Sequence, residues 1–502
     1  MFDGSRSRRG APAVLLALAM LVLSGCFGFP RKESGPAKGE PPARKPNIVF
    51  VLTDDLSWKL IAHMPQVKRM QAEGVTFDNF LVADSLCCTS RSTIFTGQYP
   101  HNTNVRTNFP PLGGYDVFQR EGGEQESFAP ALQKAGYRTA MLGKYMNGYQ
   151  PRDAATGSTN VPHGWSEWYV AGNGYPEFGY NLNENGRIVH YGEEPQDYMT
   201  DVLAYKGLDF IERSHASGQP FFMEISTFAP HGPFVPAPRH AGTFPGLTAP
   251  RTPAFNEADI TDKPAWLRHH NKTLGPRQIQ RIDEGYRDRV RMVQSVDEMV
   301  GRIRDALTRL GIAKDTVVVF GSDNGFHMGE HRLAGGKMTP YTIDVRVPFV
   351  FVGPGIGGGG RVSHIVQNTD LAPTFLELAA APVPAATDGR SLVPFLRGDA
   401  PGDWRDTALI EHVKPAYSEQ DPDRQDALPG APTTYNALRT TDLLYVEYAD
   451  GEREYYDLTR DPHHLTNIAA TLAPERQREL TARLYALTRC AGKTCASAGR
   501  SR

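Results

Sequence analysis

The sequence predicts an α/β protein, with a large sheet that carries helices on both faces and a smaller α+β subdomain after it. Two observations lead to this prediction. Over residues 46–398, short apolar strands alternate with longer segments of helical periodicity, and no internal repeat is visible. From residue 399 to 502, the pattern changes to short strand-like segments that one helix closes. The chain has 502 residues, 40% of them hydrophobic, which is enough for a large and a smaller core.

The individual elements follow from hydrophobic periodicity. Continuous apolar runs predict buried strands at residues 47–52, 139–142, 221–227 and 316–320. Helical periodicity predicts helices at residues 64–73, where Gly74 would end the helix, and at 197–214, 277–310 and 369–379. In the smaller subdomain we expect strands at residues 408–411, 435–439 and 443–448, and a last helix at 474–488.

The first 45 residues are predicted to precede the folded domain. Residues 1–25 combine arginines with an apolar run too short to span a bilayer, which is the layout of a secretory signal peptide. The string Leu23-Ser24-Gly25-Cys26 resembles a bacterial lipobox. It implies an exported lipoprotein of the cell envelope that acyl chains on Cys26 attach to a membrane. Residues 26–45 have the composition of a flexible tether. The alternative is an ordinary signal peptide with an incidental Cys26.

Charge and cysteine content narrow the partners further. The formal net charge is -2, and neither a basic field nor an acidic tail stands out, which argues against nucleic acid as a partner. An oxidising compartment would favour a small disulfide loop between Cys490 and Cys495. Adjacent Cys87 and Cys88 are left over, and they could also pair with each other or with the C-terminal cysteines.

Oxygen-bearing side chains follow two of the predicted strands. Asp54-Asp55 comes after the strand at 47–52, and Asp323-Asn324 comes after the strand at 316–320. In α/β sheets, ligands gather outside the carboxyl ends of strands, so the two pairs are expected to converge. Three carboxylates and an amide oxygen suit Ca²⁺ or Mg²⁺. Each pair taken singly has an ordinary alternative as a turn residue or helix cap.

A resemblance to a known family supports the metal hypothesis. Residues 85–97 (SLCCTSRSTIFTG) resemble the signature of the type I sulfatases, in which a cysteine, any residue, usually proline, then serine and arginine precede a Thr-Gly pair. Motifs similar to the N-acetylglucosamine-6-sulfatase branch extend along nearly the whole mature chain, at Tyr99-Pro100-His101-Asn102, Gly143-Lys144-Tyr145, Gly164-Trp165-Ser166, Ala229-Pro230-His231, Asp323-Asn324-Gly325, Lys337 and Tyr456-Asp457-Leu458. The resemblance implies an alkaline-phosphatase-like sulfatase fold with a large mixed sheet, and hydrolysis of a sulfate monoester on a sulfated sugar or an aryl sulfate.

The resemblance also implies roles for single residues. A formylglycine-generating enzyme would oxidise Cys87 to formylglycine, whose hydrate is the nucleophile and a metal ligand. The implied metal ligands are Asp54, Asp55, Cys87, Asp323 and Asn324. Arg91, Lys144 and Lys337 would stabilise charge on the transferred sulfuryl group, as preorganised cations do. His231 would protonate the leaving oxygen. The implied contacts to substrate are Lys144, Asn147, His231 and Lys337.

The chain departs from the family pattern at three positions. Thr89 stands where proline is usual, which bears on how efficiently Cys87 is converted. Asn147 stands close to where many sulfatases have a histidine, and Thr342 replaces an acidic residue of the glucosamine-sulfatase branch. Other features fit a structural role as well as a functional one: His101, His327 and His331, and the aromatic residues Trp165, Trp168, Tyr169, Tyr175 and Tyr180.

Two other functions are compatible with the sequence. The first is hydrolysis of phosphonate monoesters or phosphodiesters, a sister activity that uses similar metal ligands. The second is a surface lipoprotein that binds sulfated glycans without turnover because Thr89 prevents conversion of Cys87. Retention of every expected cationic residue argues for an enzyme, since a binding protein has no need of the full catalytic set.

Overall fold

The structure is a computed structural model of the 502-residue chain. It describes residues 44–152, 157–269, 272–423 and 431–500, and all of these belong to one compact unit. The predicted signal peptide, Cys26 and nearly all of the predicted tether lie outside the described residues. Within those ranges, the structure contains no helix with the length and apolar character that crossing a membrane requires. The predicted boundary at residue 399 stays a prediction.

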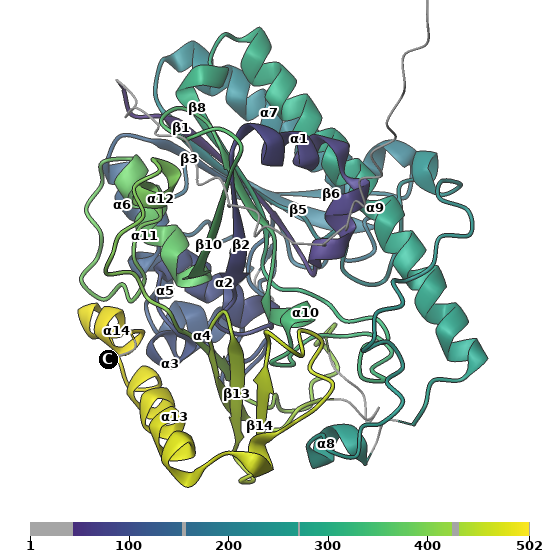
Figure 1. Cartoon of the computed structure of the whole chain (residues 1–502). Coiled ribbons are helices and arrows are strands. Elements are labelled where there is room, and N and C mark those ends of the chain that lie inside the picture. Colours follow the sequence, from purple (N-terminus) through teal and green to yellow (C-terminus); the bar gives the residue numbers. More distant parts are fainter. Residues whose placement is uncertain (1–43, 153–156, 270–271, 424–430, 501–502) are drawn as a thin grey trace, which may run out of the picture. The chain divides into compact units, whose positions relative to one another are not determined.

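Within the described residues, ten strands form one mixed sheet, which confirms the predicted fold class (Figure 1). Their order across the sheet is β10-β2-β9-β8-β1-β7-β3-β4-β5-β6. The central strands β8, β1, β7, β3 and β4 pair in parallel, and the outer pairs include antiparallel ones. The strands are β1 (Asn47–Thr53), β2 (Val75–Leu81), β3 (Arg138–Lys144), β4 (Glu167–Ala171), β5 (Tyr180–Glu184), β6 (Arg187–Tyr191), β7 (Phe221–Ser226), β8 (Thr316–Ser322), β9 (Phe349–Val352) and β10 (Gly360–Gln367).

Helices cover both faces of this sheet, because its central strands are apolar on both faces. In β1, Ile48 and Phe50 point into one core, whereas Val49 and Val51 point into the other. The first core also contains side chains of α2 (Cys87–Thr96), α6 (Phe128–Lys134) and α11 (Leu371–Leu378). The second contains side chains of α1 (Pro65–Glu73), α7 (Met199–Ser217) and α9 (Pro276–Arg309). The four helices predicted for the large domain are confirmed within three residues at each end.

A second, smaller sheet follows in the C-terminal part of the described chain. It contains the antiparallel strands β11 (Ala408–His412), β12 (Tyr435–Arg439), β13 (Leu443–Tyr448) and β14 (Arg453–Asp457). One face packs on the core of the large sheet through residues such as Ile410 and Val446. The other face packs on α13 (Pro474–Leu487), where Leu438 and Tyr445 meet Leu480 and Leu484. The expected α+β character of this region is therefore present.

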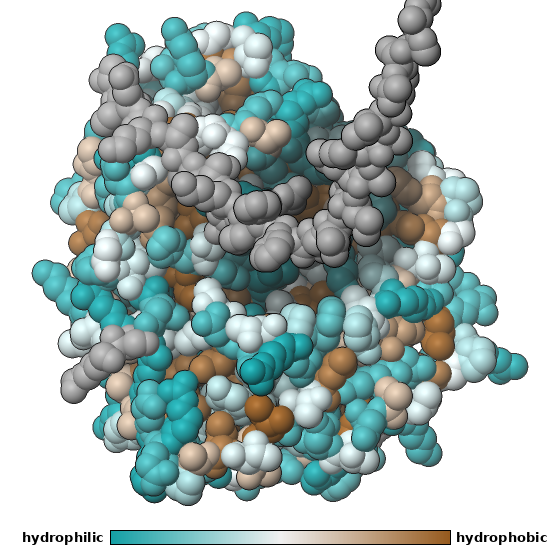
Figure 2. Space-filling view, viewed as in Figure 1, coloured by the Kyte–Doolittle hydropathy of each residue, from teal (hydrophilic) through white to brown (hydrophobic). Residues whose placement is uncertain are grey.

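Several of the remaining connections contain short helices. The α-helices among them are α3 (Pro100–Thr103), α4 (Gly114–Arg120), α5 (Gly123–Glu126), α8 (Ala265–Arg268), α10 (Thr342–Val345), α12 (Val393–Leu396) and α14 (Lys493–Ala498). The 3-10 helices are η1 (Trp58–His63), η2 (Pro195–Asp197), η3 (Pro238–His240), η4 (Ala313–Asp315), η5 (Asn368–Asp370) and η6 (Ala469–Thr471). On the face seen in Figure 2, hydrophobic residues lie scattered among hydrophilic ones, as on an ordinary protein surface.

Candidate functional site

The two acidic strand ends meet at one edge of the large sheet. Strands β1 and β8 are parallel neighbours, and their register sets Thr53 opposite Ser322. The next residues therefore lie side by side, and the backbone N–H of Asp55 donates to Asp323 Oδ1 at 3.1 Å. Asn324 Nδ2 donates to Asp55 Oδ1 at 2.6 Å. All of these carboxylate and amide side chains are fully buried.

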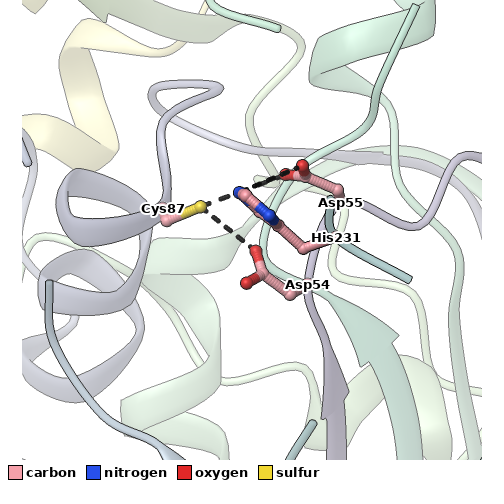
Figure 3. Close-up of side chains that lie close together, drawn as sticks. All are labelled: Asp54, Asp55, Cys87 and His231. Atoms are coloured by element: carbon pink, nitrogen blue, oxygen red, sulfur yellow. Dashed lines mark hydrogen bonds and ion pairs between the residues drawn. The ribbon is translucent and has the colours of Figure 1, made fainter. Parts of the chain in front are cut away.

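Cys87 faces these carboxylates from the first turn of α2. The helix begins at Cys87 after the extended residue Leu86, and all ten of its residues are buried. The Cys87 Sγ atom lies 3.1 Å from Asp54 Oδ1 and 4.0 Å from Asp55 Oδ1. Figure 3 shows the side chains of Asp54, Asp55, Cys87 and His231 turned toward one another. The N-terminal end of a helix favours negative charge, so α2 is oriented to stabilise an anion at residue 87.

Arg91 and Lys144 each form an ion pair with one of the buried carboxylates. Arg91, one turn after Cys87 in α2, donates from Nε to Asp323 Oδ2 at 2.8 Å. Its Nη1 donates to the carbonyl oxygen of Lys144 at 2.9 Å and to Ser226 Oγ at 2.5 Å. Lys144, the last residue of β3, donates from Nζ to Asp54 Oδ2 at 2.5 Å. Both cations are fully or almost fully buried, so each needs the carboxylate that it contacts.

Lys337 reaches the same point from the loop between β8 and α10. Its Nζ lies 2.7 Å from Asp55 Oδ1 and 2.7 Å from Cys87 Sγ.

His231 follows β7 and completes the group. Its Nδ1 lies 2.6 Å from the carbonyl oxygen of Gly232, so Nδ1–H donates there and Nε2 faces the site. Nε2 lies 3.6 Å from Asp55 Oδ2. The structure thus gathers every residue predicted to take part in catalysis or metal binding.

The structure adds a carboxylate that the sequence did not indicate. Asp423 lies in the segment between β11 and β12, and its Oδ1 is 2.7 Å from His231 Nε2 and 2.9 Å from Lys337 Nζ. Its Oδ2 accepts a hydrogen bond from Asn108 Nδ2 at 2.8 Å and lies 3.6 Å from Cys87 Sγ. No motif marks Asp423, because it comes from the C-terminal part of the chain and follows no predicted strand. It contacts three of the groups expected to face the substrate.

A cleft of about 440 Å³ opens beside these residues. Lys144, Asn147 and Tyr175 line it on one side, and Gln420 lines it from the segment that carries Asp423. Asn147 Nδ2 lies 3.3 Å from Tyr175 Oη, and Asn147 Oδ1 is buried without a hydrogen-bond partner in the described residues. An unpartnered amide oxygen that lines a cleft is free to accept from a hydroxyl or amide donor.

Burial and neighbouring charges shift the ionisation of the site. Burial raises the pKa of the Cys87 thiol well above its usual value, and the carboxylates of Asp423 and Asp54 add to the effect. For His231, burial lowers the pKa, but the carboxylates of Asp55 and Asp423 outweigh it, so the pKa is raised. Burial and repulsion from Asp54 raise the pKa of Asp323 to about 6. The site therefore favours a protonated thiol and a protonated imidazole near neutral pH.

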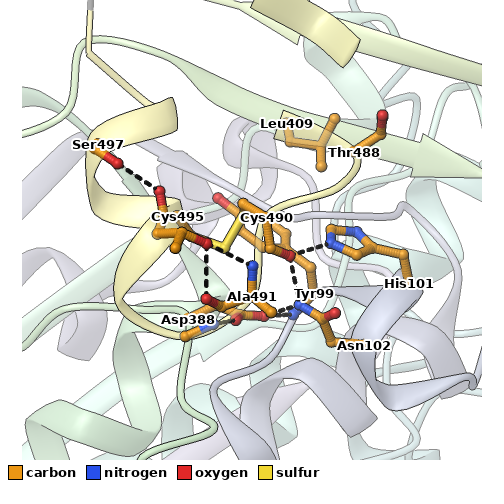
Figure 4. The surroundings of a disulfide bond; sticks show 12 residues. Tyr99, His101, Asn102, Asp388, Leu409, Thr488, Cys490, Ala491, Cys495 and Ser497 are labelled. Atoms are coloured by element: carbon orange, nitrogen blue, oxygen red, sulfur yellow. Dashed lines mark hydrogen bonds between the residues drawn. A yellow bond between two sulfur atoms is a disulfide. The ribbon is translucent and has the colours of Figure 1, made fainter. Parts of the chain in front are cut away.

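The expected disulfide between Cys490 and Cys495 is present, and Cys87 and Cys88 are free thiols. The disulfide lies beside His101, whose Nε2 is 2.8 Å from the carbonyl oxygen of Cys490 (Figure 4). The Nδ1 atom of His101 is 2.8 Å from Glu411 Oε2. His101 therefore joins α3 to the C-terminal segment, which is a structural role.

The other ambiguous residues divide between structure and site. His327 contacts Asp344, and His331 contacts Glu257, so each imidazole has a buried carboxylate partner. Of the aromatic residues, Trp165, Trp168 and Tyr180 pack in the cores. Tyr169 hydrogen-bonds to Glu167. Tyr175 alone among the five reaches the site, with its ring 4.6 Å from that of His231 and 5.0 Å from Lys144 Nζ.

Fold and site define a class of protein, a hydrolase that acts on an anionic ester. The family described as Sulfatase matches residues 46–381, and a second, described as N-sulphoglucosamine sulphohydrolase, C-terminal, matches residues 329–489. The chain is 36% identical to N-acetylglucosamine-6-sulfatase of Homo sapiens, over 98% of this chain and 93% of the relative. The chain therefore belongs to the sulfatase family. This confirms the predicted enzyme class, a sulfuric ester hydrolase, and the likeness to the N-acetylglucosamine-6-sulfatase branch.

Solved structures agree with this assignment. A protein in complex with D-glucosamine-2-N,6-O-disulfate, described as its substrate, is similar with a TM-score of 0.75 and 25% identity, over 90% of this chain and 99% of that chain. A phosphonate monoester hydrolase of Agrobacterium radiobacter is similar with a TM-score of 0.69 and 22% identity, over 88% of this chain and 96% of that chain. The second likeness shows a shared fold alone.

Asp423 provides a first prediction. Its carboxylate contacts His231 and Lys337, which a sulfate ester would also need, so Asp423→Asn should ease substrate binding. A charge-assisted hydrogen bond contributes about 1.5–3 kcal/mol, so we expect KM for an aryl sulfate to fall by about tenfold while kcat changes little. Steady-state kinetics measure this directly. The matched control is Asp421→Asn, because Asp421 lies in the same segment and accepts from Asn108 without contacting His231. A large loss of kcat in Asp423→Asn alone would show instead that Asp423 assists the reaction.

Proposed function

We propose that the protein removes a sulfate group from a sulfated amino sugar by hydrolysis, through a formylglycine derived from Cys87 and a divalent cation. The observation that carries the proposal is the position of Cys87 at the start of α2, within 3.1 Å of Asp54 and 2.7 Å of Lys337. The names of the relatives support an N-acetylglucosamine 6-sulfate unit as the substrate. The glucosamine disulfate bound by a solved relative supports a sulfated amino sugar.

The unmodified thiol is a poor nucleophile in this site. Its pKa is raised well above the usual value by burial and by two carboxylates, so it is protonated near neutral pH. This supports conversion of Cys87 by a formylglycine-generating enzyme before the protein becomes active. When formed, the aldehyde hydrate supplies one hydroxyl for attack on sulfur and a second that allows sulfate to be expelled. Lys337 Nζ, 2.7 Å from the Sγ position, would orient these hydroxyls.

The residues present fit a hard divalent cation. Asp55 Oδ2 and Asn324 Oδ1 are buried oxygens without a hydrogen-bond partner among the described residues. Ligand atoms of Asp54, Asp55, Cys87 and His231 lie within 4.8 Å of one another. The oxygen-rich set favours Ca²⁺ or Mg²⁺ over softer metals. We propose Asp54, Asp55, Asp323, Asn324 and the converted residue 87 as ligands. When bound, the cation would draw electron density from the ester oxygens.

The remaining residues have separate tasks in this proposal. Arg91 fixes the Asp323 carboxylate through a buried contact, so it positions one side of the site. Lys144 and Lys337 place positive charge where negative charge develops on the sulfuryl oxygens. His231 presents Nε2 to the site, and the carboxylates of Asp55 and Asp423 raise the pKa of its imidazole, which favours the protonated form. It is therefore able to give a proton to the leaving oxygen. Asn147 would accept from a sugar hydroxyl at the edge of the cleft.

The role of Cys87 generates a second prediction. Cys87→Ser should abolish turnover of an aryl sulfate, because a serine hydroxyl can attack sulfur once but has no second hydroxyl with which to expel sulfate. Cys88→Ala should remain active, because the Cys88 side chain packs in the core and its hydrogen bond to Asn108 is made by the backbone N–H. Its cost should be about 1 kcal/mol of stability. Steady-state rates and the mass of the peptide that contains residue 87 measure both effects.

Two controls sharpen this test. Thr89→Pro should leave the activity equal or raise it, because residue 89 lies in the first turn of α2, where the backbone N–H has no helical partner. Matched aryl sulfate and aryl phosphonate esters should show a preference for the sulfate. Normal turnover in Cys87→Ser with a dead Cys88→Ala would place the nucleophile at Cys88. An unconverted Cys87 in the wild-type protein would favour a glycan-binding protein without turnover.

The metal proposal gives a third prediction. Asp54→Ala should lose bound calcium or magnesium and reduce kcat by more than about a thousandfold, as expected when a charged ligand at a catalytic site is removed. Metal content by mass spectrometry and steady-state kinetics on the same sample test both parts. Asp421→Asn serves as the control, since it removes a nearby carboxylate that lies outside the ligand group. A variant that keeps a full complement of metal would refute the role given to Asp54.

The location of the protein is a further part of the proposal. We expect an exported lipoprotein of the cell envelope, on the basis of the lipobox-like string Leu23 to Cys26 and the polar segment behind it. Cys26→Ser should prevent acylation, since the thiol is the acceptor, and should release the protein from membranes or block its processing. Fractionation of cells followed by immunoblotting measures this. Unchanged association with membranes would contradict the lipid-anchor proposal, but it would not bear on the proposed enzyme activity.

A further inference from the structure

A second cavity lies apart from the active-site cleft. It has a volume of about 360 Å³ and shares no lining residue with the cleft. The loop that carries Lys337 lines it through Glu330 and Tyr341, which lie before and after Lys337 in the chain. Helix α10, which begins at Thr342, lies between the two sheets (Figure 1). The cavity is thus separate from the catalytic centre but built on the same loop.

The cavity contains a buried arginine that forms no ion pair with a carboxylate of the described residues. Arg439, the last residue of β12, is only 6% exposed and lines the cavity. Its Nη1 donates to Thr342 Oγ1 at 3.0 Å, and its Nε has no hydrogen-bond partner within the described residues. Burial and repulsion from Arg346 lower the pKa of Arg439 to about 9, so the group is still charged near neutral pH. A buried cation without a counterion is costly to desolvate.

A second arginine lines the same cavity. Arg346 follows α10, its Nε also lacks a hydrogen-bond partner, and its guanidinium lies 5.6 Å from the ring of Trp58. Burial and the charge of Arg361 lower the pKa of Arg346, whereas the charge of Asp78 raises it. In the described part of the chain, neither Arg346 nor Arg439 forms an ion pair with a carboxylate within 4.0 Å. Two guanidinium groups therefore repel each other across one cavity.

The nearby carboxylates are engaged elsewhere. Glu330 lines the cavity, but it contacts Lys59 at 3.4 Å and accepts from the backbone N–H of Met328 at 2.7 Å. Asp78 is held by both Nε and Nη2 of Arg361. The lining has three cationic side chains, Lys59, Arg346 and Arg439, and one carboxylate, which gives a net charge of +2 with histidines counted as neutral. Burial and the charge of Arg439 lower the pKa of His464 well below its usual value, so this imidazole is neutral.

From this arrangement we infer that the cavity is a second anion-binding site, which takes a sulfate or carboxylate group between Arg346 and Arg439. Guanidinium groups bind such oxyanions through two parallel N–H donors, and an anion would relieve the mutual repulsion of the two arginines. The inference goes beyond hydrolysis of the ester in the cleft. Where it concerns the substrate, it rests on the proposed function, because an acidic glycan carries further charged groups besides the ester that is cleaved.

The remaining lining favours an anion carried on a sugar ring. The lining includes the apolar side chains of Trp58, Leu458 and Pro462, and the carbon face of a sugar ring packs well against side chains of this kind. Thr441 adds a polar side chain to the lining. A volume of about 360 Å³ is in the range of small-ligand pockets. A free inorganic anion such as sulfate could bind the two arginines in the same way, and the experiment distinguishes it from an anionic group on a glycan.

The test uses the mature protein and the variants Arg439→Gln and Arg346→Gln. Crystals soaked in selenate, a heavier analogue of sulfate, should show anomalous density between the two arginines in the wild-type protein and lose it in each variant. KM for a sulfated tetrasaccharide, divided by KM for an aryl sulfate, should rise about tenfold in each variant, as expected when one charge-assisted contact is lost. Arg309→Gln, which removes an exposed arginine paired with Glu212, should change neither measurement.

The outcomes separate the sources of the anion. Selenate density together with the raised KM ratio assigns the site to an acidic glycan. Selenate density with an unchanged ratio, and a rise in melting temperature with inorganic sulfate that Arg439→Gln abolishes, assigns it to a free anion. Absent density in the wild-type protein, together with an unchanged KM ratio in both variants, overturns the inference. If no sulfate ester is hydrolysed at all, the proposed function fails, while the crystals still report on the anion site.

Discussion

The parallel pairing of β1 with β8 sets the positions of the buried carboxylate and amide groups that the other residues of the candidate site contact. With Thr53 opposite Ser322, the two acidic strand ends emerge side by side. A shift of one residue would turn alternate side chains of one strand to the other face of the sheet. Close packing on both faces opposes this shift, because it would set the side chains of Ile48 and Phe50 in the core that now fits Val49 and Val51. The chemistry at the edge of the sheet thus depends on hydrophobic residues that never contact it.

Gathering carboxylates at one buried point is possible only with compensating charge. Asp54 and Asp55 are fully buried, and each is contacted by a lysine, Lys144 and Lys337 respectively. Each isolated ion would cost several kcal/mol to bury, whereas the paired ions offset much of that cost. The Arg289 guanidinium supports the same loop by donating to the backbone carbonyl of Asp55. The cations that suit a sulfate ester are therefore also the cations that allow the carboxylates to fold together.

The sequence indicated the parts of the site that follow strong local patterns. Asp54 and Asp323 could be found because they end continuous apolar strands, and Cys87 because a signature surrounds it. Asp423 could not be found, because its contact with His231 joins residues 192 positions apart and no motif surrounds it. The strands, too, could be predicted only where the local sequence pattern is strong. Strands β1 (NIVFVLT) and β8 (TVVVFGS) have continuous apolar runs between polar ends, whereas β2 (VTFDNFL) and β5 (YNLNE) mix polar and apolar residues, and the neighbouring strands decide their conformation.

Buried arginines occur in two opposite electrostatic settings in this protein. Arg91 has a carboxylate 2.8 Å from Nε and a hydroxyl and a carbonyl at Nη1, so most of its desolvation cost is met within the fold. Arg439 has one hydroxyl and a second arginine nearby, so its cost is not met by the described residues. The first setting stabilises the native structure whether or not a ligand is present. In the second, the described residues supply no counterion for the positive charge and an added anion would neutralise it, which is what distinguishes a binding site from a structural ion pair.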